Sequence, residues 1–546
     1  METDTSTLPT IIGFSALLGV ASHLGYFIHG EHHLEAVRLA ILLFTSPLCI
    51  FTFIIKFDPR SAAWSAARLT AIIVSPYLAS LTTSILTYRV FFHPLRRFPG
   101  PLSAKLTKLA HVLRLLKKSD NYLQADRLHK KYGEIVRIGP NEVTIIIPDA
   151  VPLIYGPGSK CTKTAWYDVV GLPNKSLQLE RDPAIHAKRR KVWDRAFNSK
   201  ALKDYENRVV GHADQLVKQL QARSGEPVDG SLWMNFYAFD VMGDIAFGKT
   251  FDMLATGEKH HGLTALQDGM APLGLATPFP WAIPIFQALP QPPGIDHWIN
   301  FCDKQILARK KYNPEQSDIM TWLIEAENEN PDPIVSDPRW LWGDTRLVIV
   351  AGSDTSSSAM THIFYHLAKE PYIITKLREE LATFYKPGSE NEIRDLQDAK
   401  YLNGVINEAL RLHPPVPSGV LRQTPPEGIT VGDTFIPGGV TISAPSWSMG
   451  RLESCFKHAE EFLPERWVDN SELILNKGVF IPFASGAYSC IGKQLALMEL
   501  RIVTARLVTG FDIAFAPGET GKGLLEETKD VFTMEVASLM LVFTRI

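Results

Sequence analysis

Three apolar stretches in the first 92 residues constrain the fold more than any other feature of the chain. They run from Ile11 to Phe27, from Leu39 to Ile55 and from Leu69 to Thr87. The middle one, LAILLFTSPLCIFTFII, carries no charge and nearly spans a bilayer core of about 30 Å, so it is the clearest membrane helix. Buried helices of a soluble domain are the alternative. We expect residues 1–92 to form a membrane region with up to three apolar spans.

Positive charge follows the third stretch directly. The segment from Arg89 to Lys118 carries eight lysines and arginines. Because basic residues gather at the cytoplasmic ends of membrane helices, we expect the rest of the chain to face the cytosol. Pro94, Pro99 and Pro101 make the joint stiff rather than floppy. No basic start with a small-residue cleavage site precedes these spans, so a removed signal peptide is not expected.

Charge and cysteine usage narrow the possible partners. The formal net charge is −2 and the main body has no basic patch interleaved with aromatic residues, so nucleic acid is not an expected partner. The five cysteines are far apart and form no CxxC pair, which argues against a disulfide framework or a zinc site. After residue 102 the chain alternates helical segments with proline-rich turns, and short strand patterns occur at Glu134–Asp149 and Gly428–Pro445. We predict one large, mainly α domain there.

The stretch PFASGAYSCIGK, Pro482 to Lys493, places Cys490 between two glycines at the start of an apolar helix that ends at Gly510. A free cysteine is often simply part of a core, and that is the alternative here. Unpaired amides and the helix dipole favour the thiolate, which is the form that binds metal. Gly486 and Gly492 allow a backbone to approach a flat ligand. The segment predicts a solitary metal ligand beside a planar group.

A second feature is an unusually long helix, predicted between Asp337-Pro338 and Pro371. Its middle reads VIVAGSDTSSSAM, where a glycine and a row of hydroxyl side chains interrupt an apolar run. A solvated helix face is one explanation for Asp354 and Thr355, but the preceding LVIVAG is too apolar for it. An acid and an alcohol side by side in an apolar helix predict a proton relay.

Together these motifs resemble the cytochrome P-450 haem-thiolate monooxygenases, over residues 85–546. The resemblance implies a mainly α fold with small β-sheets, preceded by N-terminal transmembrane helices, with residues 93–546 as the haem-binding monooxygenase domain. The cofactor would be haem b, with the Cys490 thiolate as its axial iron ligand, which favours cleavage of bound oxygen. Phe483 would pack near that ligand, and AGSDTS, Ala351 to Ser356, would be the oxygen-activation segment.

Two further motifs strengthen the resemblance. Glu408-Ala-Leu-Arg411 matches the family's ExxR helix, and Pro464-Glu-Arg-Trp467 matches its later PER segment. In the family, residues matching Glu408, Arg411 and Arg466 form a buried charged triad. An ExxR pair alone would be an ordinary pair on a helix surface. Four motifs in the right order and spacing are far more specific.

The sequence also departs from the family pattern. A basic residue that donates to a haem propionate usually stands two positions before the cysteine, and Tyr488 occupies that position here. The early WxxxR motif, aligned on Phe197, has His186 at its tryptophan and Arg190 at its arginine. Arg190 is a candidate propionate ligand, and a basic surface stripe is the alternative. Arg422, in SGVLRQTP, matches the family's other propionate-binding arginine, and arginine binds carboxylates in bidentate fashion.

The apolar run from Met270 to Gly294 contains seven prolines, which exclude a continuous helix. An exposed apolar, irregular segment marks a binding or membrane surface, whereas a buried loop is the alternative. By resemblance it forms the lid over the substrate entrance. We therefore expect a lipophilic small-molecule substrate, collected partly from the membrane.

The joint and the multi-span N-terminus look like those of fungal microsomal enzymes of secondary metabolism. The resemblance implies an endoplasmic reticulum membrane and insertion of one atom of molecular oxygen into an alkaloid, terpenoid or polyketide intermediate. No flavin or nicotinamide fingerprint appears, so an NADPH-dependent membrane reductase is the expected partner. Two alternatives remain: a haem-thiolate enzyme that rearranges or dehydrates its substrate, and a membrane-anchored haem protein without turnover.

Overall fold

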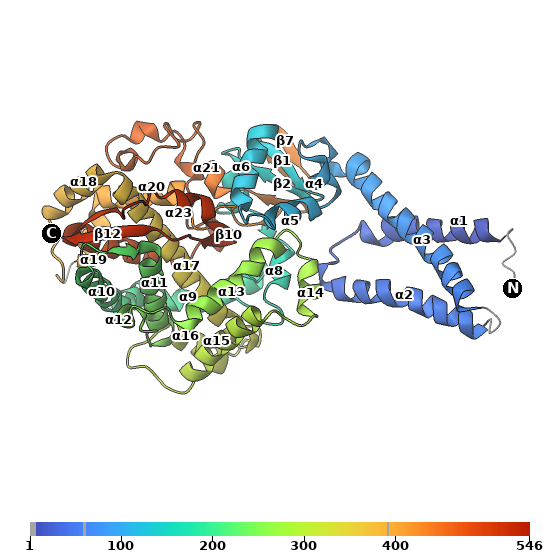
Figure 1. Cartoon of the computed structure of the whole chain (residues 1–546), viewed down its shortest axis with the longest axis horizontal. Coiled ribbons are helices and arrows are strands. Elements are labelled where there is room, and N and C mark those ends of the chain that lie inside the picture. Colours follow the sequence, from blue (N-terminus) through green and yellow to red (C-terminus); the bar gives the residue numbers. More distant parts are fainter. Residues whose placement is uncertain (1–6, 58–61, 390–391) are drawn as a thin grey trace.

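Three helices leave the body of the protein on one side and carry the three apolar stretches (Figure 1). They are α1 (Leu8–Ser22), α2 (Ala36–Phe57) and α3 (Ala63–Thr87). Short π-helical turns, η1 (His23–Phe27) and η3 (Tyr88–Phe92), extend the first and the third. Each of the three is long and apolar enough to cross a membrane. The computed structural model describes residues 7–57, 62–389 and 392–546, so part of the predicted membrane region 1–92 lies outside the described residues.

Close backbone contact holds α1 against α3. A Cβ atom at Gly19 would lie 2.1 Å from Ser80 Oγ and 2.4 Å from the Tyr77 carbonyl oxygen, so only glycine fits at this crossing. Small residues at such crossings let membrane helices pack without a hydrophobic driving force. The Tyr77 hydroxyl also donates a hydrogen bond to Ser22 Oγ at 3.2 Å. Helices α1 and α3 therefore form a packed pair.

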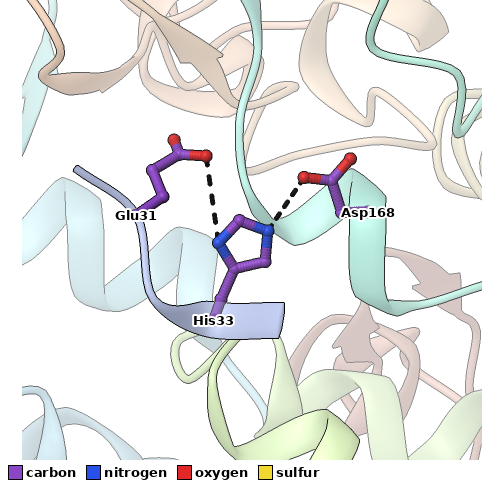
Figure 2. Close-up of side chains that lie close together, drawn as sticks. All are labelled: Glu31, His33 and Asp168. Atoms are coloured by element: carbon purple, nitrogen blue, oxygen red, sulfur yellow. Dashed lines mark hydrogen bonds and ion pairs between the residues drawn. The ribbon is translucent and has the colours of Figure 1, made fainter. Parts of the chain in front are cut away.

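The segment between α1 and α2 is bonded to the body. Arg181 donates hydrogen bonds to Glu31 at 2.9 and 3.2 Å and another to Asp168. His33 Nε2 lies 2.8 Å from Asp168 Oδ2, and its Nδ1 lies 3.8 Å from Glu31 Oε2 (Figure 2). Gln423 Nε2 donates to Glu31 at 3.0 Å. We call these five residues the inter-span latch. Because Arg181 already compensates both carboxylates, we interpret the group as an ion-pair network rather than a metal site.

Helices dominate the body, as the sequence predicts. Their bounds are α4 (Leu102–Leu106), α5 (Leu109–Leu115), α6 (Asn121–Tyr132), α7 (Ala150–Tyr155), α8 (Trp166–Val169), α9 (Pro183–Ala196), α10 (Ser199–Ala222), α11 (Gly230–Phe247), α12 (Met253–Thr256), α13 (His261–Ala276), α14 (Ala282–Gln287), α15 (Pro293–Arg309), α16 (Ile319–Glu329), α17 (Arg339–Lys369), α18 (Pro371–Ala382), α19 (Glu392–Asp398), α20 (Lys400–Leu412), α21 (Ser446–Met449), α22 (Lys493–Gly510) and α23 (Lys522–Glu527). Short 3-10 turns include η5 (Pro464–Trp467) and η8 (Gly486–Tyr488).

Small sheets complete the body. The largest has the order β1-β2-β8-β5-β3, and the others are β4-β12-β9, β6-β7 and β10-β11. The strands are β1 (Ile135–Gly139), β2 (Glu142–Ile145), β3 (Thr162–Lys163), β4 (Pro227–Asp229), β5 (Arg422–Gln423), β6 (Ile429–Val431), β7 (Thr434–Ile436), β8 (Thr441–Ser443), β9 (Phe511–Phe515), β10 (Lys529–Val531), β11 (Thr533–Glu535) and β12 (Met540–Arg545). The predicted hairpin is confirmed, since β1 pairs antiparallel with β2. Strands also form in the second predicted segment, but not as one sheet: β6 pairs with β7, whereas β8 joins the largest sheet beside β2.

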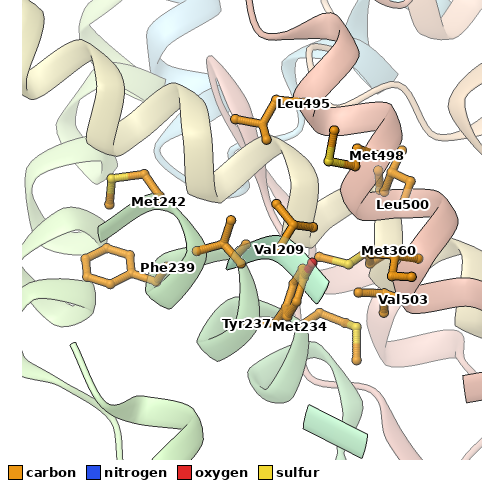
Figure 3. Close-up of a cluster of buried hydrophobic side chains, with 14 of the residues drawn as sticks. Val209, Met234, Tyr237, Phe239, Met242, Met360, Leu495, Met498, Leu500 and Val503 are labelled. Atoms are coloured by element: carbon orange, nitrogen blue, oxygen red, sulfur yellow. The ribbon is translucent and has the colours of Figure 1, made fainter. Parts of the chain in front are cut away.

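The long helix α17 lies at the centre of the main core. Pro338 precedes it and Pro371 begins the next helix, which explains both ends. At about 1.5 Å per residue, its 31 residues extend about 46 Å. Figure 3 shows Met234 and Tyr237 of α11, Met360 of α17, and Leu500 and Val503 of α22 packed together. This core fixes α17 relative to the cysteine-bearing segment that precedes α22.

The apolar proline-rich run is more helical than the sequence suggested. The prediction that no continuous helix crosses it is confirmed, because α13 ends at Ala276 and α15 begins at Pro293. However, α13 continues through Pro272, and the short α14 forms within the run. Trp281 and Phe286 are exposed, and α14 packs against α2. The run therefore contacts α2, one of the three apolar helices.

Candidate active site

A cavity of about 1780 Å³ lies between α17, the loop before α22 and the proline-rich run. Its wall is mainly apolar and includes Val350 and Ala351 of α17, Phe279 and Ile283 of the run, and Val420. Cys490 also lines this cavity, and no other cysteine among the described residues does. Sequence motifs more than a hundred residues apart thus face one space.

The loop that carries Cys490 is held by its own backbone. The Cys490 amide donates to the Phe483 carbonyl at 2.8 Å, and α22 begins three residues after the cysteine. Burial raises the pKa of the Cys490 thiol, while the Gly492 and Lys493 amides and the charge of Arg190 act in the opposite direction. Amides at a helix start stabilise a thiolate, so this sulfur is arranged to carry a positive metal ion.

The two glycines of the loop serve different purposes. Gly486 has φ +63°, and a Cβ there would lie 2.7 Å from the Gly156 carbonyl oxygen, so the turn and its neighbour require glycine. Gly486 is not among the residues that line the cavity, and the expected approach to a flat ligand does not account for it. A Cβ atom at Gly492 would lie 4.0 Å from Cys490 Sγ. Gly492 does line the cavity, beside the sulfur, which fits the expectation.

Basic and aromatic side chains gather at one edge of the cavity. The Arg422 guanidinium lies 4.7 Å from the centre of the Tyr488 ring, and the Lys163 ammonium lies 4.8 Å from it. His186 meets the same ring edge to face, with centroids 4.8 Å apart. Arg422 Nε is buried without a hydrogen-bond partner in the described chain. This edge therefore holds unneutralised positive charge that suits an anionic group.

Lys163 is the member of this edge that the sequence did not reveal. It is buried, donates to the Leu177 carbonyl at 3.1 Å, and lines the cavity. Burial, together with the charge of Arg422, lowers the pKa of its amine to about 6. A lysine in a buried strand would have indicated a functional role, but β3 has only two residues and cannot be recognised from the sequence pattern.

Arg190 also lines the cavity and donates to the Ser489 carbonyl at 2.7 Å. Its neighbour Arg189 is buried and pairs with Asp344 of α17 at 2.7 Å, which anchors α9 beside the cavity. The stretch AKRRKVWDR is therefore not a uniform surface stripe, although Lys188 and Lys191 are exposed.

The two polar residues predicted on α17 lie in different surroundings. Thr355 lines the cavity and its hydroxyl donates to the Ala351 carbonyl at 2.9 Å. Asp354 accepts a hydrogen bond from Thr533, and burial raises its pKa to about 6. Among the hydrogen bonds of the described residues, none joins Asp354 to Thr355. The α17 sequence thus places an acid just behind the hydroxyl that faces the cavity.

The charged triad is assembled as the motifs predict. Arg411 donates to both oxygens of Glu408, at 2.9 and 2.7 Å, and Arg466 donates to Glu408 at 2.8 Å. All three side chains are completely buried. Trp467 Nε1 donates to the same carboxylate at 2.8 Å. The two arginines use their remaining donors on backbone carbonyls of the segment 450–461, so the triad fixes the chain that leads to the cysteine loop.

Comparison with known proteins agrees with this geometry. The family model described as Cytochrome P450 matches residues 99–542. The chain belongs to the cytochrome P450 family. Cytochrome P450 monooxygenase FCK2 of Fusarium pseudograminearum is 38% identical over 97% of this chain and 96% of the relative. Tryprostatin B 6-hydroxylase of Neosartorya fischeri is 38% identical over 97% of both chains, and cytochrome P450 monooxygenase notG' of Aspergillus versicolor is 38% identical over the full length of both.

The protein is thus a cytochrome P450 monooxygenase, and its family binds haem through a cysteine thiolate. The described residues fit that cofactor: one cavity-lining cysteine faces a largely apolar space, and an unpaired arginine nitrogen lies at the basic edge. The three apolar helices indicate association with a membrane. Rearrangement without oxygen insertion is not favoured, because the named relatives are monooxygenases and hydroxylases.

Proposed function

We propose that the cavity binds haem b, that the Cys490 thiolate would hold its iron, and that Phe483 and Gly492, which line the same cavity, would contact it. When bound, the haem supplies activation of molecular oxygen. Gly486 shapes the loop, and the rest of the chain orients the cofactor. The observation that carries this proposal is that the cysteine of the motif lines the cavity next to a basic edge.

We infer that the basic edge binds the haem propionates. Arg422 and Arg190 are the expected partners, and Lys163 joins them because its ammonium and the Arg422 guanidinium flank the same Tyr488 ring. Tyr488 stands where the family has a base, so its hydroxyl offers a hydrogen bond without charge. A propionate beside Lys163 would raise the pKa of its amine from about 6, and the ammonium would then supply the positive charge that this position lacks. Charge-assisted hydrogen bonds of this kind are roughly twice as strong as neutral ones.

We propose that Thr355 and Asp354 deliver protons to the cavity. Thr355 lines the cavity, and its hydroxyl would hold a water or a proton there. Asp354 has a pKa of about 6, so it exchanges a proton readily near neutral pH. Its hydrogen bond with Thr533 gives it a path to the β10-β11 hairpin. A general acid that is poised near the working pH is the most effective one.

We propose a lipophilic substrate, of the kind made in fungal secondary metabolism: an alkaloid, terpenoid or polyketide intermediate. The mainly apolar lining supports this, and so do relatives that include a tryprostatin B hydroxylase. Hydrophobic walls discriminate weakly between similar shapes, by about 1–3 kcal/mol per methylene. The lining therefore defines a class of substrate rather than one molecule.

We infer that residues 1–92 anchor the protein in the endoplasmic reticulum and that residues 93–546 form a cytosolic monooxygenase domain. The inter-span latch and the end of α3 both meet the body, while the start of α1 and the end of α2 point away from it (Figure 1). Three spans would place the start of α1 across the membrane from the body. The basic residues after α3 support a cytosolic body. An NADPH-dependent membrane reductase would supply the electrons.

The test compares metabolites of a host with and without this protein. The strain lacking it should accumulate a lipophilic precursor that is lighter than the normal product by one oxygen atom. Membranes containing this protein and a reductase should convert that precursor and incorporate labelled molecular oxygen. Conversion without oxygen or reductant would contradict oxygen insertion.

The ligand assignment has its own test. Cys490→Ser should abolish the long-wavelength Soret band of the reduced, carbon-monoxide-bound protein, whereas the matched Cys49→Ser variant should keep it. Cys49 is exposed on α2, far from the cavity in sequence and absent from its lining. A wild-type band in Cys490→Ser would show that another residue holds the iron.

A further inference from the structure

A second cavity, of about 1500 Å³, lies between the three membrane helices and the body. We call it the vestibule. The membrane helices contribute Phe14, Leu43 and Tyr77 to its lining, one from each of α1, α2 and α3. The body contributes residues from α6, the β8 region and the β10-β11 hairpin. The vestibule therefore exists only because the helices and the body are held together.

A thin wall separates the vestibule from the active-site cavity. Five residues line both spaces: Trp166, Trp281, Ile285, Gly419 and Phe532. Trp166 and Phe532 stack with ring centroids 5.1 Å apart and an interplanar angle of 13°. Phe532 has φ +88°, a backbone conformation that is strained for a bulky residue. A stacked aromatic pair with a strained backbone is thus part of the wall that the two cavities share.

The vestibule also has a directional string of polar groups that the active site does not use. His111 Nε2 lies 2.8 Å from Asn121 Oδ1, and Asn121 Nδ2 donates to Ser418 Oγ at 2.8 Å. Ser418 donates to the Asp530 carboxylate, which also accepts from the Phe532 amide at 3.2 Å. His111, Asn121, Ser418 and Asp530 line the vestibule but not the active-site cavity. From His111 through Asn121 and Ser418, each residue donates its hydrogen bond to the next residue in the direction of Asp530.

His111, the end of this hydrogen-bond chain that lies farthest from Asp530, offers an acceptor nitrogen. Because Asn121 Oδ1 accepts, the proton of the neutral imidazole is on Nε2, and His111 Nδ1 is left with a lone pair. Burial and the charge of Lys108 lower the pKa of His111 to about 3, which keeps the ring neutral. Among the hydrogen bonds of the described residues, none uses His111 Nδ1. A ligand that uses this acceptor would donate a hydrogen bond to it, and the apolar side chains of the three helices would contact its apolar part.

We propose that the vestibule is a holding site for the enzyme's own substrate, and that this substrate carries a hydroxyl or N–H group that donates to His111 Nδ1. The inference rests on the proposed lipophilic substrate. The shared wall is its main support, because a molecule in the vestibule is one aromatic pair away from the active-site cavity. Displacement of Trp166 and Phe532 then admits the molecule directly, without return to the bilayer.

Photolabelling tests the proposal, with 4-hydroxybenzophenone as an apolar probe that donates one hydrogen bond. The full-length holoenzyme in phosphatidylcholine nanodiscs is irradiated with the probe, and the adducts are located by peptide mass spectrometry. We expect adducts at vestibule residues that saturate with probe concentration and exceed those formed by plain benzophenone. One hydrogen bond is worth about 0.5–1.5 kcal/mol, so the preference should be roughly 2- to 10-fold.

Variants identify the acceptor. His111→Phe should remove the preference for 4-hydroxybenzophenone, whereas His29→Phe, an exposed histidine outside the vestibule lining, should retain it. Ala40→Trp, which narrows the vestibule from α2, should lower labelling by both probes while the reduced carbon-monoxide band of the haem stays intact. That band and labelling of the active-site cavity report the proposed function separately.

Three results would overturn the proposal. The first is vestibule labelling that rises linearly with probe and is equal for both benzophenones, since bilayer lipid would then fill the space. The second is the absence of vestibule adducts in a protein with an intact haem band. The third is unchanged labelling and preference in both His111→Phe and Ala40→Trp.

Discussion

The carboxyl of Glu499 should make the protein less stable as the pH rises, and Glu499→Gln should remove that loss. Glu499 lies on α22 and is buried, with Oε2 lacking a hydrogen-bond partner in the described chain. Burial raises its pKa from 4.5 to about 8, and a hydrogen bond with Ser356 opposes the shift only in part. The folded protein therefore holds a proton at pH 7 that the unfolded chain releases.

The sign and the size follow from this difference. Between pH 4.5 and pH 8 the folded state binds more protons than the unfolded state, so the free energy of unfolding falls as the pH rises. Each pH unit in that window is worth about 1.4 kcal/mol. Glutamine has no proton to lose. The free energy of unfolding of Glu499→Gln, relative to that of the wild type, should therefore rise by about 3 kcal/mol between pH 5 and pH 7.

Thermal release of haem from the full-length holoenzyme, followed by absorbance at pH 5, 6, 7 and 8, measures the effect. The midpoint temperatures of the wild type and Glu499→Gln should be similar at pH 5, and that of the variant should be several degrees higher at pH 7 to 8. Glu472→Gln, an exposed glutamate on the same body, should follow the wild type at every pH. If wild type and Glu499→Gln lose stability in parallel as the pH rises, the carboxyl is charged in the folded state and the argument fails.

Three further outcomes are expected. Thr355→Ala should bind haem normally but consume reductant to make peroxide, with product formation down by about 10²- to 10⁴-fold; unchanged coupling would exclude a relay through this hydroxyl. Glu408→Gln should lower the free energy of unfolding by about 3–5 kcal/mol, because Arg411 and Arg466 lose their buried counter-charge. A wild-type yield of haem-loaded protein would contradict this. Lys163→Met should lose haem to apomyoglobin about tenfold faster, as expected for one charged hydrogen bond; an unchanged rate would remove Lys163 from the propionate site.

The parts of the site that the sequence predicted are those set by short motifs. Cys490 and the pair Glu408 and Arg411 each depend on residues only a few positions apart, so spacing alone identifies them. The same holds for the ends of α17, where prolines act locally. These features need no knowledge of what lies opposite in the fold.

The parts that the sequence missed depend on distant partners. Lys163 gains its surroundings from Arg422 and Tyr488, which follow it by more than 250 residues. Arg181 reaches Glu31 across 150 residues of chain. Gly486 lies in the expected loop, but its contact with Gly156 could not be predicted, because Gly156 comes from a different part of the sequence. Tertiary packing decides such roles, and pattern alone does not contain it.

The inter-span latch limits how the body can move above the bilayer. A body joined to the membrane by one helix can swivel about the axis of that helix. This body is joined at the end of α3 and, at a second point, through Glu31 and Arg181. Two separate attachments remove the swivel, so the proline-rich run always faces the same side of the lipid. The membrane reductase proposed above would then meet a body whose orientation is fixed.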